Sequence, residues 1–350
     1  MNNTDIETTP ISLDIPQVPD ISDPGYIHTF THNQLLDMDL PGTPAIIPGL
    51  LLTGVTILAG APKIGKSFLV LQIGYHVATG KSMWDRPVLT GHVLYLALED
   101  TERRLQQRSY DMFGPDGTNN LHFATAAKKV NSGLLDQLSY FLNQYPDTGL
   151  IIIDTMQASR DGTPKGNLYA EDCAFMETIQ GFSKKYKVSI LLVHHTRKMP
   201  DQTDSFNMVS GSNGNMGGAD TTIVMSKENR TDRKATLEIT GRDIPDQRLL
   251  LARAPDSPCW ELSEQESDEW DQPDDPILRK VSQLVTEDAP ELACSATELK
   301  DKLGVELPPN QLSRHLSIHA GLLESRYHIT LTKQTRHQGR VLCLTYHPEK

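Results

Sequence analysis

The stretch GVTILAGAPKIGKSFLVLQIGYHVATG, residues 54–80, decides the fold of this 350-residue chain. It opens with an apolar strand pattern (VTILA) and continues with a helix pattern (SFLVLQIGYHVA). Between the two, residues 60–67 match the phosphate-binding sequence GxxxxGK[ST] without a mismatch. In such a loop the backbone N–H groups and the N-terminus of the helix face the phosphates of a nucleotide. A strand, this loop and a helix in this order predict a nucleotide-binding α/β domain.

The loop supplies the predicted ATP-binding residues. The Lys66 ammonium is expected to reach the β- and γ-phosphates, and the Ser67 hydroxyl is expected to bind Mg²⁺. A strand–helix turn that binds no ligand is the alternative, and the patterns on both sides of the loop argue against it. The predicted cofactor-binding residues are Gly60, Ala61, Pro62, Lys63, Ile64, Gly65, Lys66, Ser67 and Phe68.

Further apolar runs predict a sheet around this loop. The runs cover residues 92–98, 149–154, 189–195, 221–227 and 235–240. They alternate with helix-period stretches, which cover residues 67–80, 101–113, 132–145 and 170–187. Such alternation is typical of a mostly parallel sheet that helices cover on both faces. The sequence therefore predicts an α/β nucleotide-binding domain over residues 45–254.

Acidic residues at strand ends are the first candidates for catalysis. Asp154 ends the run LIIID, at the sheet edge where ligands bind, and can hold Mg²⁺ through water. A helix cap or a turn carboxylate is the alternative for Asp154. Glu99 and Asp100 end the run HVLYLALED. Glu99 has the longer side chain and is the candidate for orienting the attacking water, whereas Asp100, or both, could cap the helix at Thr101.

Two further strand ends carry candidate residues. His194 and His195 end SILLVHH, where one of them can contact the γ-phosphate or merely end the strand. We place His195 among the catalytic residues; the pair lacks a third ligand at metal-binding spacing. Arg242 ends the run ATLEITGR and can act on a neighbouring subunit's nucleotide as an arginine finger. A solvated surface arginine is the alternative for Arg242.

The net charge of −12 is unevenly distributed. Residues 1–48 hold seven acids and residues 255–276 hold nine, and neither stretch has a Lys or Arg. We interpret residues 1–44 as a disordered acidic arm and residues 255–276 as an acidic linker. Trp260 and Trp270 are unusual in a solvated linker and can pack onto a domain. Because the folded parts carry little net charge, the total does not exclude a polyanionic partner.

Residues 277–350 predict a second domain. Helix patterns cover PILRKVSQLV and residues 310–320, and a capping box at Ser295–Glu298 opens a short helix that ends at Gly304. Two strands, 327–332 and 340–346, follow around a turn. Three helices before a hairpin is the order of a winged helix, whose third helix and basic wing contact DNA. The predicted duplex contacts are Arg314, Lys333, Arg336 and Arg340; a winged helix used for protein contacts is the alternative.

Composition excludes several other classes of protein. The four cysteines lie far apart and form no CxxC pair, which argues against a structural zinc site and a disulfide scaffold. This cysteine usage is typical of a cytoplasmic protein. The sequence contains no run of about 18 apolar residues, so it predicts no transmembrane helix and no membrane partner.

In order, the blocks GVTILAGAPKIGKS, HVLYLALED, LIIID, LLVHHTRK, a GS…GGAD segment and GRD resemble the RecA-like P-loop ATPases of the plasmid RepA helicase type. These are relatives of the DnaB and KaiC groups. The resemblance spans about residues 45–254 and is specific because six blocks occur in order. It implies a homo-oligomeric ring, usually of six subunits, with ATP at the subunit interfaces.

The resemblance also implies roles for individual residues. Lys66, Ser67, Asp154 and Glu99 would act as argued above, His195 or His194 would sense the γ-phosphate, and Arg242 would be the finger from the next subunit. The loop after His195, with Arg197 and Lys198, would contact single-stranded DNA in the ring. The simplest RepA-type helicases end soon after this core, whereas this chain adds an acidic linker and a winged-helix-like domain.

Three functions are compatible with these patterns. The leading hypothesis is an ATP-hydrolysing DNA motor, a RepA-like replicative helicase of a plasmid, phage or mobile element. The second is a non-translocating DNA-binding ATPase, such as a loader, initiator or regulator, that uses ATP as a switch. The third is a RecA-like module that assembles proteins on DNA. Glu99 and Arg242 favour ATP turnover, whereas the winged helix favours recognition of a DNA site.

Overall fold

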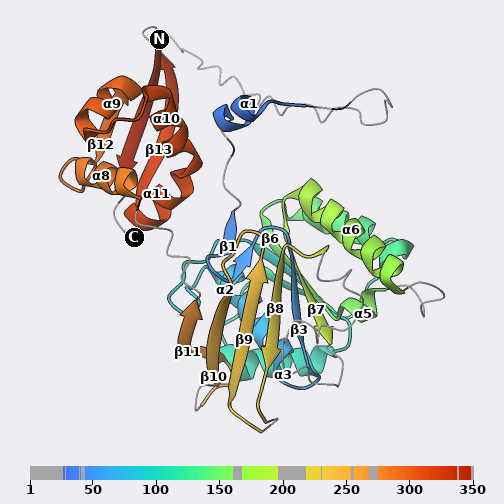
Figure 1. The fold of residues 1–350 in the computed structure, drawn as a ribbon. Coiled ribbons are helices and arrows are strands. Elements are labelled where there is room, and N and C mark those ends of the chain that lie inside the picture. The colour runs from blue at the N-terminus through green and yellow to red at the C-terminus, as the bar shows by residue number, and fades with distance from the viewer. Residues whose placement is uncertain are drawn as a thin grey trace, which may run out of the picture. The chain divides into compact units, whose positions relative to one another are not determined.

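The computed structural model describes residues 27, 29–38, 40, 44–160, 168–195, 218–229, 231–253, 256–267, 275–336 and 339–347. The chain divides into two compact units (Figure 1). The larger unit covers Thr43–Asp274, and the smaller unit combines Met1–Gly42 with Asp275–Lys350. No helix among the described residues has the length and apolar character needed to cross a bilayer.

The larger unit is built on one nine-stranded sheet with the order β11-β10-β9-β8-β3-β7-β6-β4-β5. Its strands are β3 (Val55–Gly60), β4 (His92–Ala97), β5 (Leu121–Ala124), β6 (Thr148–Asp154), β7 (Ser189–His195), β8 (Thr221–Ser226), β9 (Lys234–Gly241), β10 (Gln247–Arg253) and β11 (Trp260–Ser267). The six strands from β8 to β5 are parallel, and β9, β10 and β11 extend the sheet antiparallel. The prediction of a mostly parallel sheet is thus confirmed.

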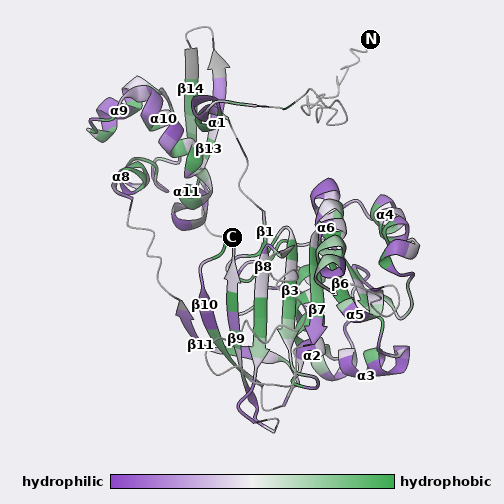
Figure 2. Cartoon of the chain, turned by 45° about the vertical axis from the view of Figure 1, so that its right-hand side comes forward, coloured by the Kyte–Doolittle hydropathy of each residue, from purple (hydrophilic) through white to green (hydrophobic). Residues whose placement is uncertain are grey.

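Helices cover both faces of this sheet. One face packs against α2 (Lys66–Thr79), α3 (Glu102–Phe113) and the hairpin of β1 (Ala45–Ile47) and β2 (Leu51–Leu52). The other packs against η1 (Val130–Ser132), α4 (Leu134–Gln144), α5 (Met156–Ser159) and α6 (Leu168–Tyr186). Every residue of β3 is buried, and Figure 2 shows hydrophobic inner strands beside a hydrophilic β11. Continuous apolar strands can be buried in this way only between two layers of helices.

The sequence predicted that the acidic stretch 255–276 is a linker, but part of it belongs to the sheet of the larger unit. Residues 260–267 form β11, which pairs antiparallel with β10 at the edge of the sheet. Trp260 is fully buried, so its expected packing onto a domain is correct; Trp270 lies outside the described residues. Glu261, Glu264 and Glu266 are exposed on this edge strand. Acidic side chains at a sheet edge oppose pairing with another strand, which explains them without a linker.

The smaller unit has its own core around a three-stranded antiparallel sheet with the order β12-β14-β13. Its elements are α8 (Pro276–Leu284), β12 (Glu291–Ser295), α9 (Ala296–Leu303), α10 (Pro309–Ile318), α11 (Ala320–Tyr327), β13 (Ile329–Arg336) and β14 (Gly339–Tyr346). The capping box of Ser295 and Glu298 and the left-handed Gly304 occur as predicted. Neither β12 nor α11 was predicted from the sequence, and β13 extends four residues beyond its predicted end, to Arg336.

The acidic arm is also partly ordered. Residues 32–37 form α1 (His32–Asp37), which begins with a capping box between Thr31 and Gln34. Arg314 on α10 donates from Nε and Nη2 to the two carboxylate oxygens of Asp37 at 2.6 and 2.8 Å. The prediction of a disordered arm is therefore wrong for this segment, because a capping box and a two-point ion pair stabilise one helical turn. Residues 1–26 lie outside the described residues.

Candidate active site

Four parallel strands bring Lys66, Glu99, Asp154 and His195, four of the five predicted catalytic residues, to one edge of the sheet. Gly60 at the end of β3 pairs with His195 at the end of β7, and Ala97 at the end of β4 pairs with Asp154 at the end of β6. Glu99 follows two residues after Ala97. Parallel strands end at a common edge, so these side chains meet there. They surround a cleft of about 570 Å³ whose lining includes Lys66, Ser67, Glu99, Asp154, His195 and Arg253.

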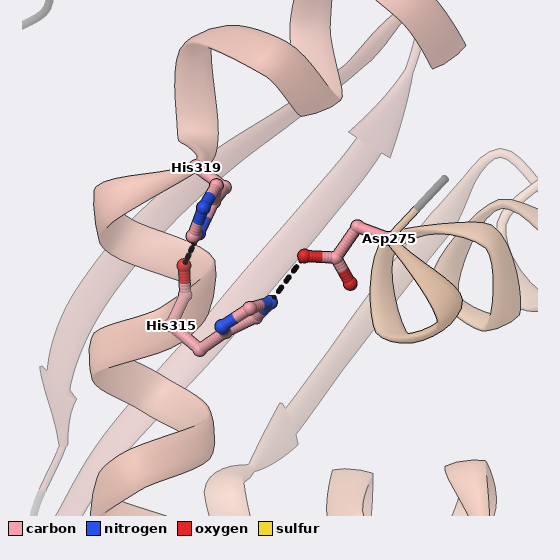
Figure 3. A group of neighbouring side chains, drawn as sticks. All are labelled: Asp275, His315 and His319. Atoms are coloured by element: carbon pink, nitrogen blue, oxygen red, sulfur yellow. Dashed lines mark hydrogen bonds and ion pairs between the residues drawn. The ribbon is translucent and has the colours of Figure 1, made fainter. Parts of the chain in front are cut away.

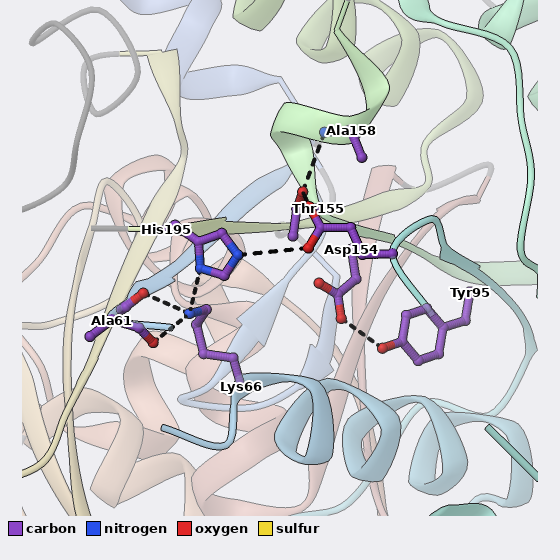
Figure 4. A network of polar contacts seen from close by, with 9 residues as sticks. Ala61, Lys66, Tyr95, Asp154, Thr155, Ala158 and His195 are labelled. Carbon is purple, nitrogen blue, oxygen red and sulfur yellow. Dashed lines mark hydrogen bonds and ion pairs between the residues drawn. The ribbon is translucent and has the colours of Figure 1, made fainter. Parts of the chain in front are cut away.

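The phosphate loop wraps around the Lys66 side chain. The ammonium donates hydrogen bonds to the carbonyl oxygens of Gly60 at 2.6 Å and Ala61 at 2.9 Å, and lies 3.1 Å from Nδ1 of His195 (Figure 4). Gly65 precedes α2 with a φ of 111°. A Cβ at Gly65 would lie 2.7 Å from Cζ2 of Trp260. The loop therefore needs glycine here for its backbone conformation and for space.

Burial changes the acid–base chemistry of Lys66. Only 4% of this residue is exposed. Loss of solvation lowers the pKa of Lys66 to about 8, although the negative charges of Asp154 and Glu99 oppose the change. An ammonium in such a position gains most from an anionic ligand, because the ligand replaces the lost solvation with a direct charge contact. The loop is therefore electrostatically suited to phosphate.

Asp154 is oriented by Tyr95, a residue that was not predicted from the sequence. The buried hydroxyl of Tyr95 donates to Oδ2 of Asp154 at 2.9 Å. Burial and the Asp154 charge raise the pKa of Tyr95 well above its usual value, so Tyr95 acts as a hydrogen-bond donor. Figure 4 shows the Asp154 carboxylate between Tyr95 and Lys66. A carboxylate held here beside the hydroxyl of Ser67, which lines the same cleft, fits the oxygen ligands that Mg²⁺ prefers.

Glu99 and Asp100 have different surroundings. The hydroxyl of Thr155 donates to Oε1 of Glu99 at 2.7 Å, which orients this carboxylate in the cleft. Asp100 forms an ion pair with Arg108 at 2.8 Å, and Thr101 rather than Asp100 caps α3. Glu99 is thus the acid whose carboxylate remains half-exposed to the cleft. The sequence analysis did not predict a role for Thr155, although its position directly after Asp154 placed it at the same strand end.

The structure separates the two histidines. His195 lines the cleft, whereas His194 is buried, since successive strand residues face opposite sides of the sheet. The Lys66 ammonium only donates, so Nδ1 of His195 accepts and Nε2 carries the proton. That Nε2 lies 4.0 Å from Oε2 of Glu99. Burial and the Lys66 charge lower the pKa of His195, which keeps its ring neutral at pH 7.

Arginines that were not predicted also line the cleft. The guanidinium of Arg253 lies 4.5 Å from the ring centre of Phe68 and 4.9 Å from that of Trp260. That of Arg108 lies 5.0 Å from the Phe68 ring. Nε of Arg253 and Nη1 of Arg108 are buried and have no hydrogen-bond partner among the described residues. The sequence did not predict Arg253 as a cleft residue, because it did not predict β10. Arg104 and Arg108 lie one helical turn apart on α3, and this spacing was a sequence signal for arginines beside the cleft.

Arg242 does not join this cleft. It follows β9, which runs antiparallel to β8, so it lies at the edge where the parallel strands begin. Its guanidinium lies 3.4 Å from Oδ1 of Asp220, and 58% of the side chain is exposed. Any contact of Arg242 with a nucleotide therefore requires a second subunit. Arg197 and Lys198 lie outside the described residues, as do the side chains of Arg336 and Arg340; Arg314 and Lys333 belong to the smaller unit.

Comparisons with known proteins agree with this geometry. The family described as "AAA domain" matches residues 28–201. Of two similar solved structures, one is an ATPase domain and the other is a DnaB-like replicative helicase, studied for its interactions with primase. Each has a TM-score of 0.51 and 12% sequence identity to this chain.

The match to the first structure covers 61% of this chain and 85% of that one, and the match to the second covers 66% of each. A search of curated proteins finds no match. At 12% identity the two structures establish a shared fold, while the family match covers the phosphate loop and the strand ends at Glu99, Asp154 and His195. The larger unit therefore has the fold of a RecA-like P-loop ATPase domain, and residues 28–201 match the AAA domain family.

Proposed function

We propose that this protein is an ATP-hydrolysing motor that acts on single-stranded DNA, a replicative helicase of the RepA type from a plasmid, phage or mobile element. The gathering of Lys66, Asp154, Glu99 and His195 around one cleft carries the proposal. One of the two similar structures is a DnaB-like replicative helicase, which supports the same class of activity.

In this proposal each residue of the cleft has one task. Lys66 leaves the carbonyl oxygens of its loop and binds the β- and γ-phosphates of ATP. Ser67 and Asp154 hold Mg²⁺, which supplies positive charge at those phosphates. Glu99, positioned by Thr155, orients the attacking water and accepts its proton.

His195 is the proposed sensor of the γ-phosphate. Its ring contacts the Lys66 ammonium and lies near the Glu99 carboxylate, so a change in either neighbour alters its hydrogen bonds. The chain continues from His195 directly into residues 196–217. In the proposal, Arg197 and Lys198 of this stretch contact single-stranded DNA, so the state of the nucleotide reaches the DNA through β7.

A ring is the assembly that this proposal needs. Arg242 is distant from the cleft of its own chain and half-exposed, which supports a role as an arginine finger on a neighbouring subunit. We therefore propose a homo-oligomer, a hexamer by resemblance, with ATP at the interfaces.

A DNA-binding ATPase that does not translocate is the second candidate. The smaller unit favours it, because a helix, a strand, three helices and a hairpin follow one another from α8 to β14, which resembles the order of a winged helix. Arg314, Lys333, Arg336 and Arg340 lie on its α10, β13 and β14, where they would contact duplex phosphates.

The steady-state ATPase rate with and without single-stranded DNA distinguishes the two candidates, with duplex DNA and the Lys66→Ala variant as controls. We expect single strands to stimulate hydrolysis and Lys66→Ala to abolish it. Slow hydrolysis without stimulation, together with tight and site-selective duplex binding, would support the switch and contradict the motor.

A further inference from the structure

We propose that Asp275, His315 and His319 of the smaller unit bind a divalent transition-metal ion of the Zn²⁺ class. One ligand atom from each residue lies within 4.8 Å of the others, and all three residues are partly buried. Figure 3 shows the two rings on the same side of one helix and the carboxylate facing them from another segment. The cluster lies apart in sequence from the ATP cleft, whose residues all belong to the larger unit.

Two structural elements build this cluster. His315 on α10 and His319 directly after its last residue are four positions apart, so they project from one helix face. Their ring centres are 4.4 Å apart. Asp275 is the residue before α8, and the capping geometry of that helix brings its carboxylate to the rings. A helical histidine pair with an acid from a second segment supplies three ligands, which leaves a fourth position for water.

The atoms that would not bind metal are already held by the protein. Oδ1 of Asp275 accepts hydrogen bonds from the backbone N–H groups of Ile277 and Leu278, which leaves Oδ2 facing the histidines. Nδ1 of His319 donates to the carbonyl oxygen of His315 at 2.8 Å, which presents Nε2 as its ligand atom. Metal-binding histidines and carboxylates are commonly oriented by hydrogen bonds of this kind.

The bond between Nε2 of His315 and Oδ2 of Asp275, 2.7 Å long, marks the position of the ion. A metal ion replaces the proton between these atoms, and that proton passes to solvent. The side chains of His315 and Asp275 are 26% and 16% exposed, so an ion can enter. Imidazole ligands favour Zn²⁺, Co²⁺ or Ni²⁺ over Mg²⁺, so this site and the ATP cleft select different metals.

The test uses the full-length protein without nucleotide, in excess Mg²⁺ to occupy oxygen-rich sites. Zn²⁺ is titrated calorimetrically, and Co²⁺ is titrated while its visible d–d absorption is recorded. We expect one ion per chain, an absorption typical of tetrahedral Co²⁺, and a higher melting temperature with Zn²⁺. His319→Ala should lower Zn²⁺ affinity by about tenfold or more.

His347→Ala is the matched control, because His347 is an exposed histidine of the same unit outside the cluster. It should bind Zn²⁺ like the wild type. His319→Ala keeps the bond between His315 and Asp275, so it separates metal binding from folding even if His315→Ala does not fold. Two results would overturn the proposal: equal Zn²⁺ affinity of the wild type and His319→Ala, or no binding at micromolar Zn²⁺. The contact between His315 and Asp275 would then be only a structural hydrogen bond.

Discussion

At the scale of single residues, the protonation of Lys66 is the property with the most direct functional consequence. The ammonium is buried among carbonyl oxygens and a neutral histidine, and its pKa falls to about 8. Bound phosphates would raise that pKa again, because negative charge favours the protonated form. Nucleotide binding and protonation of Lys66 are therefore coupled.

We expect ATP binding near pH 8 to take up protons from solvent. Below pH 7, Lys66 is already protonated in the free protein and the uptake should vanish; above pH 8, ATP affinity should fall as the neutral amine must first be protonated. Calorimetric titrations in buffers of different ionisation enthalpy measure the number of protons directly. Proton release at pH 8 would contradict the coupling.

Glu99 gives a second prediction at this scale. Glu99→Gln keeps the shape and the hydrogen bond from Thr155 but removes the proposed base, so ATP hydrolysis should fall by about 10²–10⁴-fold while ATP affinity is retained. Single-turnover hydrolysis and nucleotide affinity should be measured together. Glu102→Gln, at an exposed acid in the first turn of α3, is the control and should hydrolyse ATP like the wild type.

At the scale of elements, β11 supports the phosphate loop. Trp260, its first residue, donates from the indole nitrogen to the Gly65 carbonyl oxygen at 3.3 Å. Its backbone exchanges two hydrogen bonds with the side chain of Gln72 on α2, each 2.8 Å long. A strand far away in the sequence thus holds both the loop and the helix that follows it.

Trp260→Ala should destabilise the larger unit by about 3–5 kcal/mol, because it removes a fully buried ring. It should also weaken ATP binding, since the loop loses its support. Trp260→Phe keeps most of the packing but loses the hydrogen bond to Gly65, so its effects should be smaller. Urea unfolding and ATP affinity should be measured for both variants, and both effects should be larger for Trp260→Ala than for Trp260→Phe. If Trp260→Ala folds and binds ATP like the wild type, Trp260 does not support the phosphate loop.

The contact between α1 and α10 gives another prediction at this scale, which rests on the proposed role of Arg314 in DNA binding. Asp37 engages the same guanidinium that a DNA phosphate would use. Asp37→Asn should therefore raise duplex affinity at low salt, and the gain should shrink as salt screens it. Fluorescence anisotropy across a salt series measures this. Asp288→Asn, at an exposed acid of the same unit, should change duplex affinity much less.

At the scale of the whole molecule, the proposed ring with Arg242 as its finger predicts complementation between subunits. Lys66→Ala lacks the phosphate-binding charge and Arg242→Ala lacks the finger, so each variant alone should hydrolyse ATP poorly. Mixed rings contain interfaces that pair an intact Lys66 with an intact Arg242. The mixture should therefore recover part of the wild-type rate.

The ATPase rate as a function of the mixing ratio is the measurement. Arg248→Ala serves as the control, because Arg248 is also a half-exposed arginine that forms an ion pair with an acid. A mixture that stays as inactive as its components would contradict a finger acting between subunits.

The sequence by itself determined the phosphate loop, the central parallel strands and the order of the candidate residues along them. These follow from local patterns, because a glycine-rich loop needs particular residues at fixed spacing and a doubly covered strand must be apolar throughout. The capping box at Ser295 was equally local. By contrast, the edge strand β11 is polar and carries three acids in eight residues, so its local sequence predicted a linker rather than a strand.

Only the tertiary structure decided which residues meet. It placed Trp260 and Arg253 beside the phosphate loop, selected His195 over His194 by the side of the sheet, and set Arg242 at the opposite edge. It also brought Asp275 to His315 and His319. Such contacts depend on strand order and direction, which arise from packing between segments distant in the chain and leave no periodic signal in the sequence.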